Sequence, residues 1–279
     1  MEFISVVVFL SVWCFTVPAS TQNSCGRRPL VGPPGMSRIV GGREALEGAW
    51  PWQIVRSYVR VVAGLHMWSD PGAHSQIRSI SEMKVHEDYD DFTSDSDIML
   101  LRLSSPFKFT DHVQPACTPY SVTHEVILNF THCFITGWGS SSYKGRLMSN
   151  LQEAEVELID QRRCNQLSWY GGFITENMLC AGLESGAADS CQGDSGGALQ
   201  CYSESDDRFY VVGVTSFGEE CGLPRRPGVY SRISRFADWL KAVQTAAAAT
   251  AHRPSIALIS PLLSTALTLL GNIQSGIND

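Results

Sequence analysis

The residues with the clearest chemical potential form one run, residues 189–197, with the sequence Asp-Ser-Cys-Gln-Gly-Asp-Ser-Gly-Gly. Glycines beside Ser195 allow the main chain to approach a reacting carbonyl group closely. The backbone N–H groups of Gly193 and Ser195 can then stabilise the oxyanion that forms when a serine hydroxyl attacks that carbonyl. The run therefore predicts Ser195 as a nucleophile and an oxyanion hole formed by Gly193 and Ser195.

Residues 193–197 also fit the Gly-x-Ser-x-Gly turn that carries the nucleophile of α/β-hydrolases. That fold requires alternating strands and helices, and a histidine that follows the serine in the chain. His252 is the only histidine after Ser195, and it lies in a linker rich in alanine and threonine. An α/β-hydrolase is therefore disfavoured.

The elements that must position this run are predicted to be short β-strands. Over residues 39–230, short apolar stretches with β-branched and aromatic residues alternate with Gly, Pro and Ser, which is typical of an all-β barrel or sandwich. Apolar residues then recur at helical spacing at Ile233, Phe236, Leu240 and Val243. This spacing predicts one helix that closes the domain.

The length and the net charge of the chain limit its possible domain organisation and its possible partners. A chain of 279 residues with 44% hydrophobic content suits one large domain with short flanking segments. The net charge of −7 argues against nucleic acid or an anionic membrane surface as the main partner. The expected organisation is a signal peptide (1–19), a propeptide (20–38), one domain (39–243), a linker (244–255), an apolar segment (256–271) and a polar tail (272–279).

The N-terminal flank is predicted to direct secretion. Residues 4–17 are almost wholly apolar and end at Val17-Pro18-Ala19, where small residues fit a signal peptidase site. The alternative, a membrane-anchoring helix, needs a longer apolar run. The Gly- and Pro-rich stretch that follows, up to Arg38, is expected to be an exposed tether.

The C-terminal flank allows three interpretations. Residues 256–271 carry no charge, but a spanning helix usually needs about 20 apolar residues, so a transmembrane segment is marginal. Small residues upstream also fit a lipid-anchor signal. The third interpretation is a disordered apolar tail, because Pro261 interrupts the segment.

Cysteine content predicts disulfides and no metal. One of the nine cysteines, Cys14, lies in the signal peptide, which leaves an even number in a secreted chain. No Cys-x-x-Cys pair suggests a zinc site, and neither a metal nor a cofactor is expected. Asn129-Phe130-Thr131 is a glycosylation sequon.

Six motifs together resemble the chymotrypsin-like, or trypsin-like, serine protease family, and within it the acrosin-like and membrane-anchored proteases. They occur in the family's order and are Arg38-Ile39-Val40-Gly41-Gly42, Trp50-Pro51-Trp52-Gln53, Asp97-Ile98-Met99-Leu100-Leu101, Gly137-Trp138-Gly139, residues 189–197 and Pro227-Gly228-Val229-Tyr230. The resemblance implies two six-stranded antiparallel β-barrels with a C-terminal helix.

The resemblance also implies roles for matching positions. Cleavage after Arg38 would free the amino group of Ile39 to pair with Asp194 and order the site. Asp97 would orient the imidazole that activates Ser195.

A substrate pocket is implied in the same way. Asp189 at its floor would select Arg or Lys side chains, and Gly218 and Gly228 would leave its walls open. Ser216 would lie on the strand that pairs with the extended substrate backbone, followed by Phe217 where the family usually has Trp. The disulfides implied by the resemblance are Cys25–Cys117, Cys133–Cys201, Cys164–Cys180 and Cys191–Cys221.

One expected part of the site is missing. In the family, Trp-Pro-Trp-Gln is followed by strands that end in Ala-Ala-His-Cys, which supplies the general base. Here only residues 54–60 separate Gln53 from Val61, where the resemblance resumes, so an internal deletion is inferred. The N-terminal barrel should therefore be incomplete, and no other histidine has a suitable motif context.

Two main functions remain open at this point, and a third interpretation is an active protease in which a rearranged group serves as the base. The first is a trypsin-like endopeptidase zymogen that acts after Arg or Lys and depends on an activating protease, inactive in this form. The alternative is a non-catalytic homologue that binds basic side chains of proteins or peptides at Asp189. Either would pass through the secretory pathway to the extracellular space, the cell surface or the acrosome, with membrane association through residues 256–271.

Overall fold

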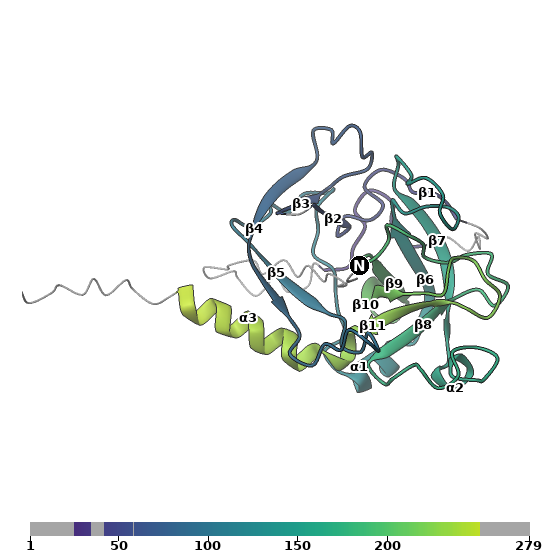
Figure 1. Ribbon diagram of the computed structural model, residues 1–279. Coiled ribbons are helices and arrows are strands. Elements are labelled where there is room, and N and C mark those ends of the chain that lie inside the picture. The colour runs from purple at the N-terminus through teal and green to yellow at the C-terminus, as the bar shows by residue number, and fades with distance from the viewer. Residues whose placement is uncertain (1–24, 35–41, 58, 252–279) are drawn as a thin grey trace, which may run out of the picture.

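Strands make up most of the regular structure of this chain (Figure 1). The computed structural model describes residues 25–34, 42–57 and 59–251. The strands are β1 (Arg43–Glu44), β2 (Ile54–Ser57), β3 (Arg60–Ala63), β4 (Gln76–Val85), β5 (Met99–Leu103), β6 (Phe130–Gly137), β7 (Gln152–Ile159), β8 (Met178–Gly182), β9 (Ala198–Ser203), β10 (Arg208–Phe217) and β11 (Gly228–Arg232). The helices are α1 (Val122–Ile127), α2 (Gln161–Cys164) and α3 (Ala237–Ala251), with a 3₁₀ turn at Ile233–Arg235.

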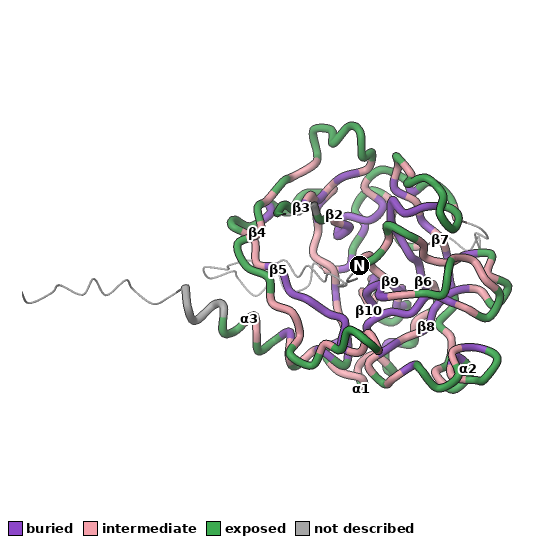
Figure 2. The backbone as a smooth tube through the Cα atoms, viewed as in Figure 1, coloured by how far each residue is buried: buried purple, intermediate pink, exposed green. Residues whose placement is uncertain are grey.

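The second half of the chain forms a closed antiparallel barrel. Its strand order is β7-β6-β9-β10-β11-β8, and β8 pairs back to β7, while β1 adds to the outer side of β7. Leu199, Val212 and Tyr230 are fully buried in its interior. β10 is rich in apolar and β-branched residues, and both β9 and β10 are mostly buried in Figure 2.

The first half forms an open four-stranded sheet in the order β2-β3-β4-β5. Where the sequence predicts a deletion, residues 54–57 form β2 and Arg60 begins β3, with Ile54 opposite Ala63 and Ser57 opposite Arg60. Most of β4 is exposed or half-buried (Figure 2). The expectation of a complete C-terminal barrel and an incomplete N-terminal one is therefore confirmed.

An aromatic cluster joins the two sheets. The ring centroid of Trp50 lies 5.1 Å from that of Phe209 and 5.3 Å from that of Phe134, and the indole N–H of Trp52 donates to Gln200 Oε1 at 2.6 Å. These large rings bury much apolar surface and fix the two halves against each other. The open sheet is thus supported on one side although it does not close.

The segment at residues 25–34 is packed. Cys25 is bonded to Cys117, and the guanidinium of Arg28 lies 4.7 Å from the ring centroid of Trp50 and 4.8 Å from that of Phe209. The expectation of an exposed tether is wrong for Gly26 and Arg28, which are buried, because a disulfide and cation–π contacts replace the apolar burial that Gly- and Pro-rich sequence lacks, whereas Leu30 and Pro33 are exposed.

A C-terminal helix is present as predicted, but it begins at Ala237, after the 3₁₀ turn at Ile233–Arg235, and it ends later than predicted. Ile233, Phe236 and Leu240 are buried against Ile98 and Leu100. Helix α3 continues to Ala251, so it includes part of the expected linker. In the part of the chain described here, no helix has both the length and the apolar character to cross a bilayer. The signal peptide (1–19) and the apolar segment (256–271) lie outside the described residues.

Candidate active site

The Ser195 turn is shaped by glycines. Gly193 has φ of 98° and Gly196 has φ of 81°, values that favour glycine. A Cβ on Gly193 would also lie 2.7 Å from Leu147 Cδ2. Ser195 is exposed, and within the described residues no acceptor bonds the N–H groups of Gly193 or Ser195. The turn therefore presents a hydroxyl and two unbonded N–H groups to solvent.

No histidine that the structure describes makes a hydrogen bond to Ser195. The ring of His66 lies 3.3 Å from Glu44 Oε1, and that of His132 lies 2.7 Å from Glu155 Oε1. The remaining described histidines contact other aromatic rings and are His74, His86, His112 and His124. Each imidazole in the described part of the chain thus has another polar or aromatic partner and no hydrogen bond to the serine hydroxyl.

Asp97 is a deeply buried acid, only 1% exposed. Ser216 donates its hydroxyl to Asp97 Oδ2 at 2.6 Å, and Ser231 donates to the backbone carbonyl of Asp97 at 2.5 Å. Ser216 is the residue skipped in the β10–β11 register between Thr215 and Phe217. This bulge breaks the regular pairing at the position from which Ser216 reaches the carboxylate.

A cavity of about 470 Å³ lies beside Ser195. Its walls come from β2, from the loop between β3 and β4, and from the loops around residues 138 and 148. The apolar side chains that line it are Ile54, Val55, Trp68, Trp138, Leu147 and Met148. The space next to Ser195 is therefore mainly apolar.

The carboxylate of Asp189 lines a second cavity, of about 200 Å³. Its Oδ2 accepts a hydrogen bond from Gly222 N at 2.9 Å, whereas its Oδ1 is buried and has no partner among the described residues. Burial raises the pKa of Asp189 to about 6, although N–H groups of Gly222, Ser190 and Gly228 oppose that rise. A Cβ on Gly228 would lie 2.7 Å from Ser190 Oγ, so a larger residue would crowd this pocket.

Asp194 occupies the same cavity. It accepts hydrogen bonds from Gly139 N at 2.8 Å and Cys191 N at 3.1 Å, and burial raises its pKa. A Cβ on Gly137 would come within 1.9 Å of Asp194 Oδ1, so glycine is required there. Residues 42 and 43 also line this cavity, while Arg38 and Ile39 lie outside the described residues.

The other residues singled out by sequence are also located. The four disulfides are Cys25–Cys117, Cys133–Cys201, Cys164–Cys180 and Cys191–Cys221, the same pairs that the resemblance implies. Gly218 is exposed, and a Cβ there would meet nothing closer than 3.8 Å. Asn129 is exposed with φ of 45°, in the connection between α1 and β6.

Comparison with known proteins agrees with this geometry. The sequence profile of the family named Trypsin matches residues 55–240. The chain belongs to the trypsin family. It is 33% identical to transmembrane protease serine 11G of Mus musculus over 239 residues, which are 75% of this chain and 56% of that protein. It is 35% identical to transmembrane protease serine 11C of Mus musculus over 246 residues, or 78% of this chain and 56% of that protein. The chain thus spans a little over half the length of these curated relatives.

One cluster on this trypsin-family chain escaped sequence reasoning. Glu47, His74 and His112 have ligand atoms that all lie within 4.8 Å of one another. They come from three separate loops, so no short-range spacing marks them in the sequence. Only the tertiary structure brings them together.

Proposed function

We propose that this chain is a trypsin-like protease homologue, made as a zymogen, that binds Arg and Lys side chains at Asp189 but hydrolyses peptide bonds very slowly. The observation that carries the proposal is that no described imidazole is bonded to the exposed Ser195 hydroxyl. A general base must lie within hydrogen-bond reach of the proton that it removes.

The pocket chemistry supports recognition of basic side chains. Asp189 Oδ1 is buried without a donor, and a guanidinium or ammonium group would supply charge-assisted hydrogen bonds to it. With a pKa of about 6, the carboxyl is mostly ionised at pH 7.5. Gly218 and Gly228 leave the walls free of side chains.

The rate argument supports slow turnover. Loss of the histidine from a serine protease triad costs about 10⁶-fold in turnover, or about 8 kcal/mol of activation free energy. The oxyanion-hole N–H groups of Gly193 and Ser195 alone cannot replace proton removal. Asp97, which would orient the imidazole, instead accepts a hydrogen bond from Ser216.

Activation follows the same family logic. Cleavage after Arg38 by another protease would free the amino group of Ile39, which would pair with the buried Asp194. The lining of the Asp194 cavity by residues 42 and 43 supports this pairing, because they follow Ile39 closely in the chain. A carboxylate in a buried cavity gains strongly from a cationic partner.

The site of action is proposed as the secretory pathway and the cell surface. The four disulfides favour an oxidising compartment, and the two curated relatives are named transmembrane proteases. Glycosylation at the exposed Asn129 and membrane association through residues 256–271 belong to the same proposal.

The test separates binding from turnover. The full chain, secreted with its disulfides and cleaved after Arg38, is titrated with benzamidine, an aryl amidine that mimics an arginine side chain. We expect binding that Asp189→Ser weakens at least tenfold, and arginyl-amide hydrolysis no faster than that of Ser195→Ala. Arginyl-amide hydrolysis that depends on Ser195, together with labelling of Ser195 by an organophosphonate, would refute the claim that this chain lacks a general base. Equal benzamidine binding by Asp189→Ser would refute the pocket assignment.

A further inference from the structure

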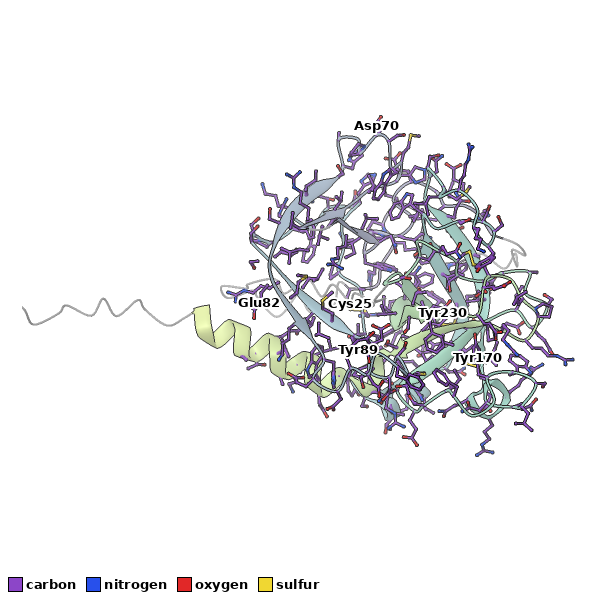
Figure 3. All side chains as sticks on the ribbon, viewed as in Figure 1. Cys25, Asp70, Glu82, Tyr89, Tyr170 and Tyr230 are labelled. Carbon is purple, nitrogen blue, oxygen red and sulfur yellow. A yellow bond between two sulfur atoms is a disulfide. The ribbon has the colours of Figure 1, made fainter. Side chains whose placement is uncertain are left out.

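A cluster of metal-binding side chains lies apart from the residues around Ser195. Glu47 is in the turn that follows β1, His74 is in the loop between β3 and β4, and His112 is in a turn between β5 and α1. Their ligand atoms all lie within 4.8 Å of one another. The loop that carries His74 is marked by the labelled Asp70 in Figure 3.

The backbone under these side chains is well anchored. The turn at His112 is closed by two backbone hydrogen bonds between Thr110 and Val113, of 2.9 and 3.1 Å, and Val113 is fully buried. A Cβ on Gly64 would lie 2.6 Å from the carbonyl oxygen of His74, so the base of that loop is tightly packed. The backbone that carries His74 and His112 is therefore held in place.

The Glu47 turn passes directly against the imidazole of His112. Gly48 has φ of 73°, and a Cβ built on it would lie 3.3 Å from His112 Cδ2. The rings of His74 and His112 are stacked, with centroids 3.8 Å apart and an angle of 3° between their planes. Within the described residues, neither ring nor the Glu47 carboxylate makes a side-chain hydrogen bond.

Two imidazoles and one carboxylate form a ligand set that suits zinc. Zinc sites of this His₂Glu type leave a fourth position for water, whereas calcium requires six to eight oxygen ligands. Ligand atoms on a tetrahedral zinc ion are about 3.4 Å apart, so these atoms need to approach by at most about 1.4 Å. Because His74 is exposed, its ring can tilt away from the ring of His112 and direct a nitrogen toward the position that the zinc ion would occupy between the three side chains.

We propose that Glu47, His74 and His112 form a zinc-binding site that ties the open four-stranded sheet to the rest of the molecule. The loop of His74 belongs to the open sheet, whereas Glu47 follows β1, which pairs with β7 of the closed barrel. A bound ion would connect the open sheet to the loop that follows β1. An ion that binds the folded chain but not the unfolded chain stabilises the folded state.

The experiment titrates Zn²⁺ into the full, disulfide-bonded chain by isothermal calorimetry and follows thermal unfolding with and without Zn²⁺. We expect one site whose affinity falls at least tenfold in His74→Ala, in His112→Ala and in Glu47→Gln. The matched control is His124→Ala, which removes an imidazole on α1 and should bind Zn²⁺ like the unaltered chain. Zn²⁺ should also slow proteolysis between residues 61 and 103 in the unaltered chain and in the control only.

Three results would overturn the proposal. The first is failure of the unaltered chain to bind Zn²⁺, which would mean that the two imidazoles only stack. The second is binding of Zn²⁺ by the three variants as tightly as by the His124→Ala control, which would place the ion elsewhere. The third is loss of binding in the variants without a rise in the unfolding temperature of the unaltered chain on addition of Zn²⁺, which would contradict the link between the sheets. Circular dichroism of each variant separates loss of a ligand from loss of the fold.

Discussion

Burial of the Asp189 carboxylate lowers the stability of the free chain when this group is ionised. Burial raises its pKa from the ordinary 3.8 to about 6, which means that the folded protein favours the protonated form. Between pH 4 and pH 6 the folded state therefore binds more protons than the unfolded state, and stability falls as pH rises through this window. Well above pH 6 the full loss of folding stability is present, and a cationic ligand of the carboxylate would offset it.

The substitution Asp189→Asn should remove the destabilisation that the buried, ionised carboxylate causes. At pH 8 we expect the variant to unfold with a free energy higher than that of the unaltered chain by up to about 3 kcal/mol, because no charge is buried. At pH 4 the two proteins should be nearly equal. Urea unfolding at both pH values measures the difference. A variant that is less stable at pH 8 would show that the carboxylate is not strained in the free chain.

Ser216→Ala tests the hydrogen bond to the buried Asp97. The change leaves a buried acceptor without one of its donors, so we expect the free energy of unfolding to fall by about 1 to 3 kcal/mol. Ser105→Ala, at an exposed serine, should change it by less than about 0.5 kcal/mol. If the two serine variants unfold at the same urea concentration, Ser216 contributes nothing to holding Asp97.

At the scale of elements, the main contrast is between a closed barrel and an open sheet. In the closed barrel, β8 pairs back to β7, so the strands of that ring have partners on both sides. In the open sheet, β2 and β5 are edges, and edge strands are the places where sheets open or pair with other chains. The short hairpin from β2 to β3 keeps the sheet continuous without completing a barrel.

Hydrogen exchange should reveal this contrast. We expect backbone amides of β4 and β5 to exchange at least tenfold faster than those of β9 and β10, because an open sheet separates at lower free energy than a closed barrel. Mass spectrometry of peptides from each strand measures the rates, in the absence of added metal. Equal protection of the two sets would mean that the open sheet is as stable as the barrel.

At the scale of the whole molecule, the N-terminal segment is bound to the closed barrel. The disulfide from Cys25 to Cys117 spans 92 residues of sequence, and Arg28 packs over the aromatic cluster between the two sheets. A cut after Arg38 would therefore leave residues 25–34 attached. The segment contributes to stability as well as to retention.

Removal of this disulfide should be costly. For Cys25→Ala with Cys117→Ala we expect the free energy of unfolding to fall by about 2 to 5 kcal/mol. Loss of the Cys164–Cys180 bridge, which spans 16 residues, should cost about 1.5 kcal/mol less, because a shorter loop loses less chain entropy. Equilibrium urea unfolding of both double variants compares them. A larger loss from the shorter loop would contradict the entropic argument.

Much of the fold could be predicted from local patterns and ordered motifs. Apolar stretches punctuated by Gly and Pro predicted the strands, and the spacing of Ile233, Phe236 and Leu240 predicted the closing helix. The packing of residues 25–34 could not be predicted, because it depends on partners such as Trp50 and Phe209 that lie far away in sequence.

The sequence by itself determined the family-like order of motifs, the Ser195 turn and the shortness of the stretch between Gln53 and Val61, because these are properties of neighbouring residues. Only the tertiary structure decided that this stretch forms a hairpin, that Asp189 Oδ1 is buried without a donor, and that Glu47, His74 and His112 meet. Burial and convergence depend on how distant segments pack, and no local spacing in the chain encodes them.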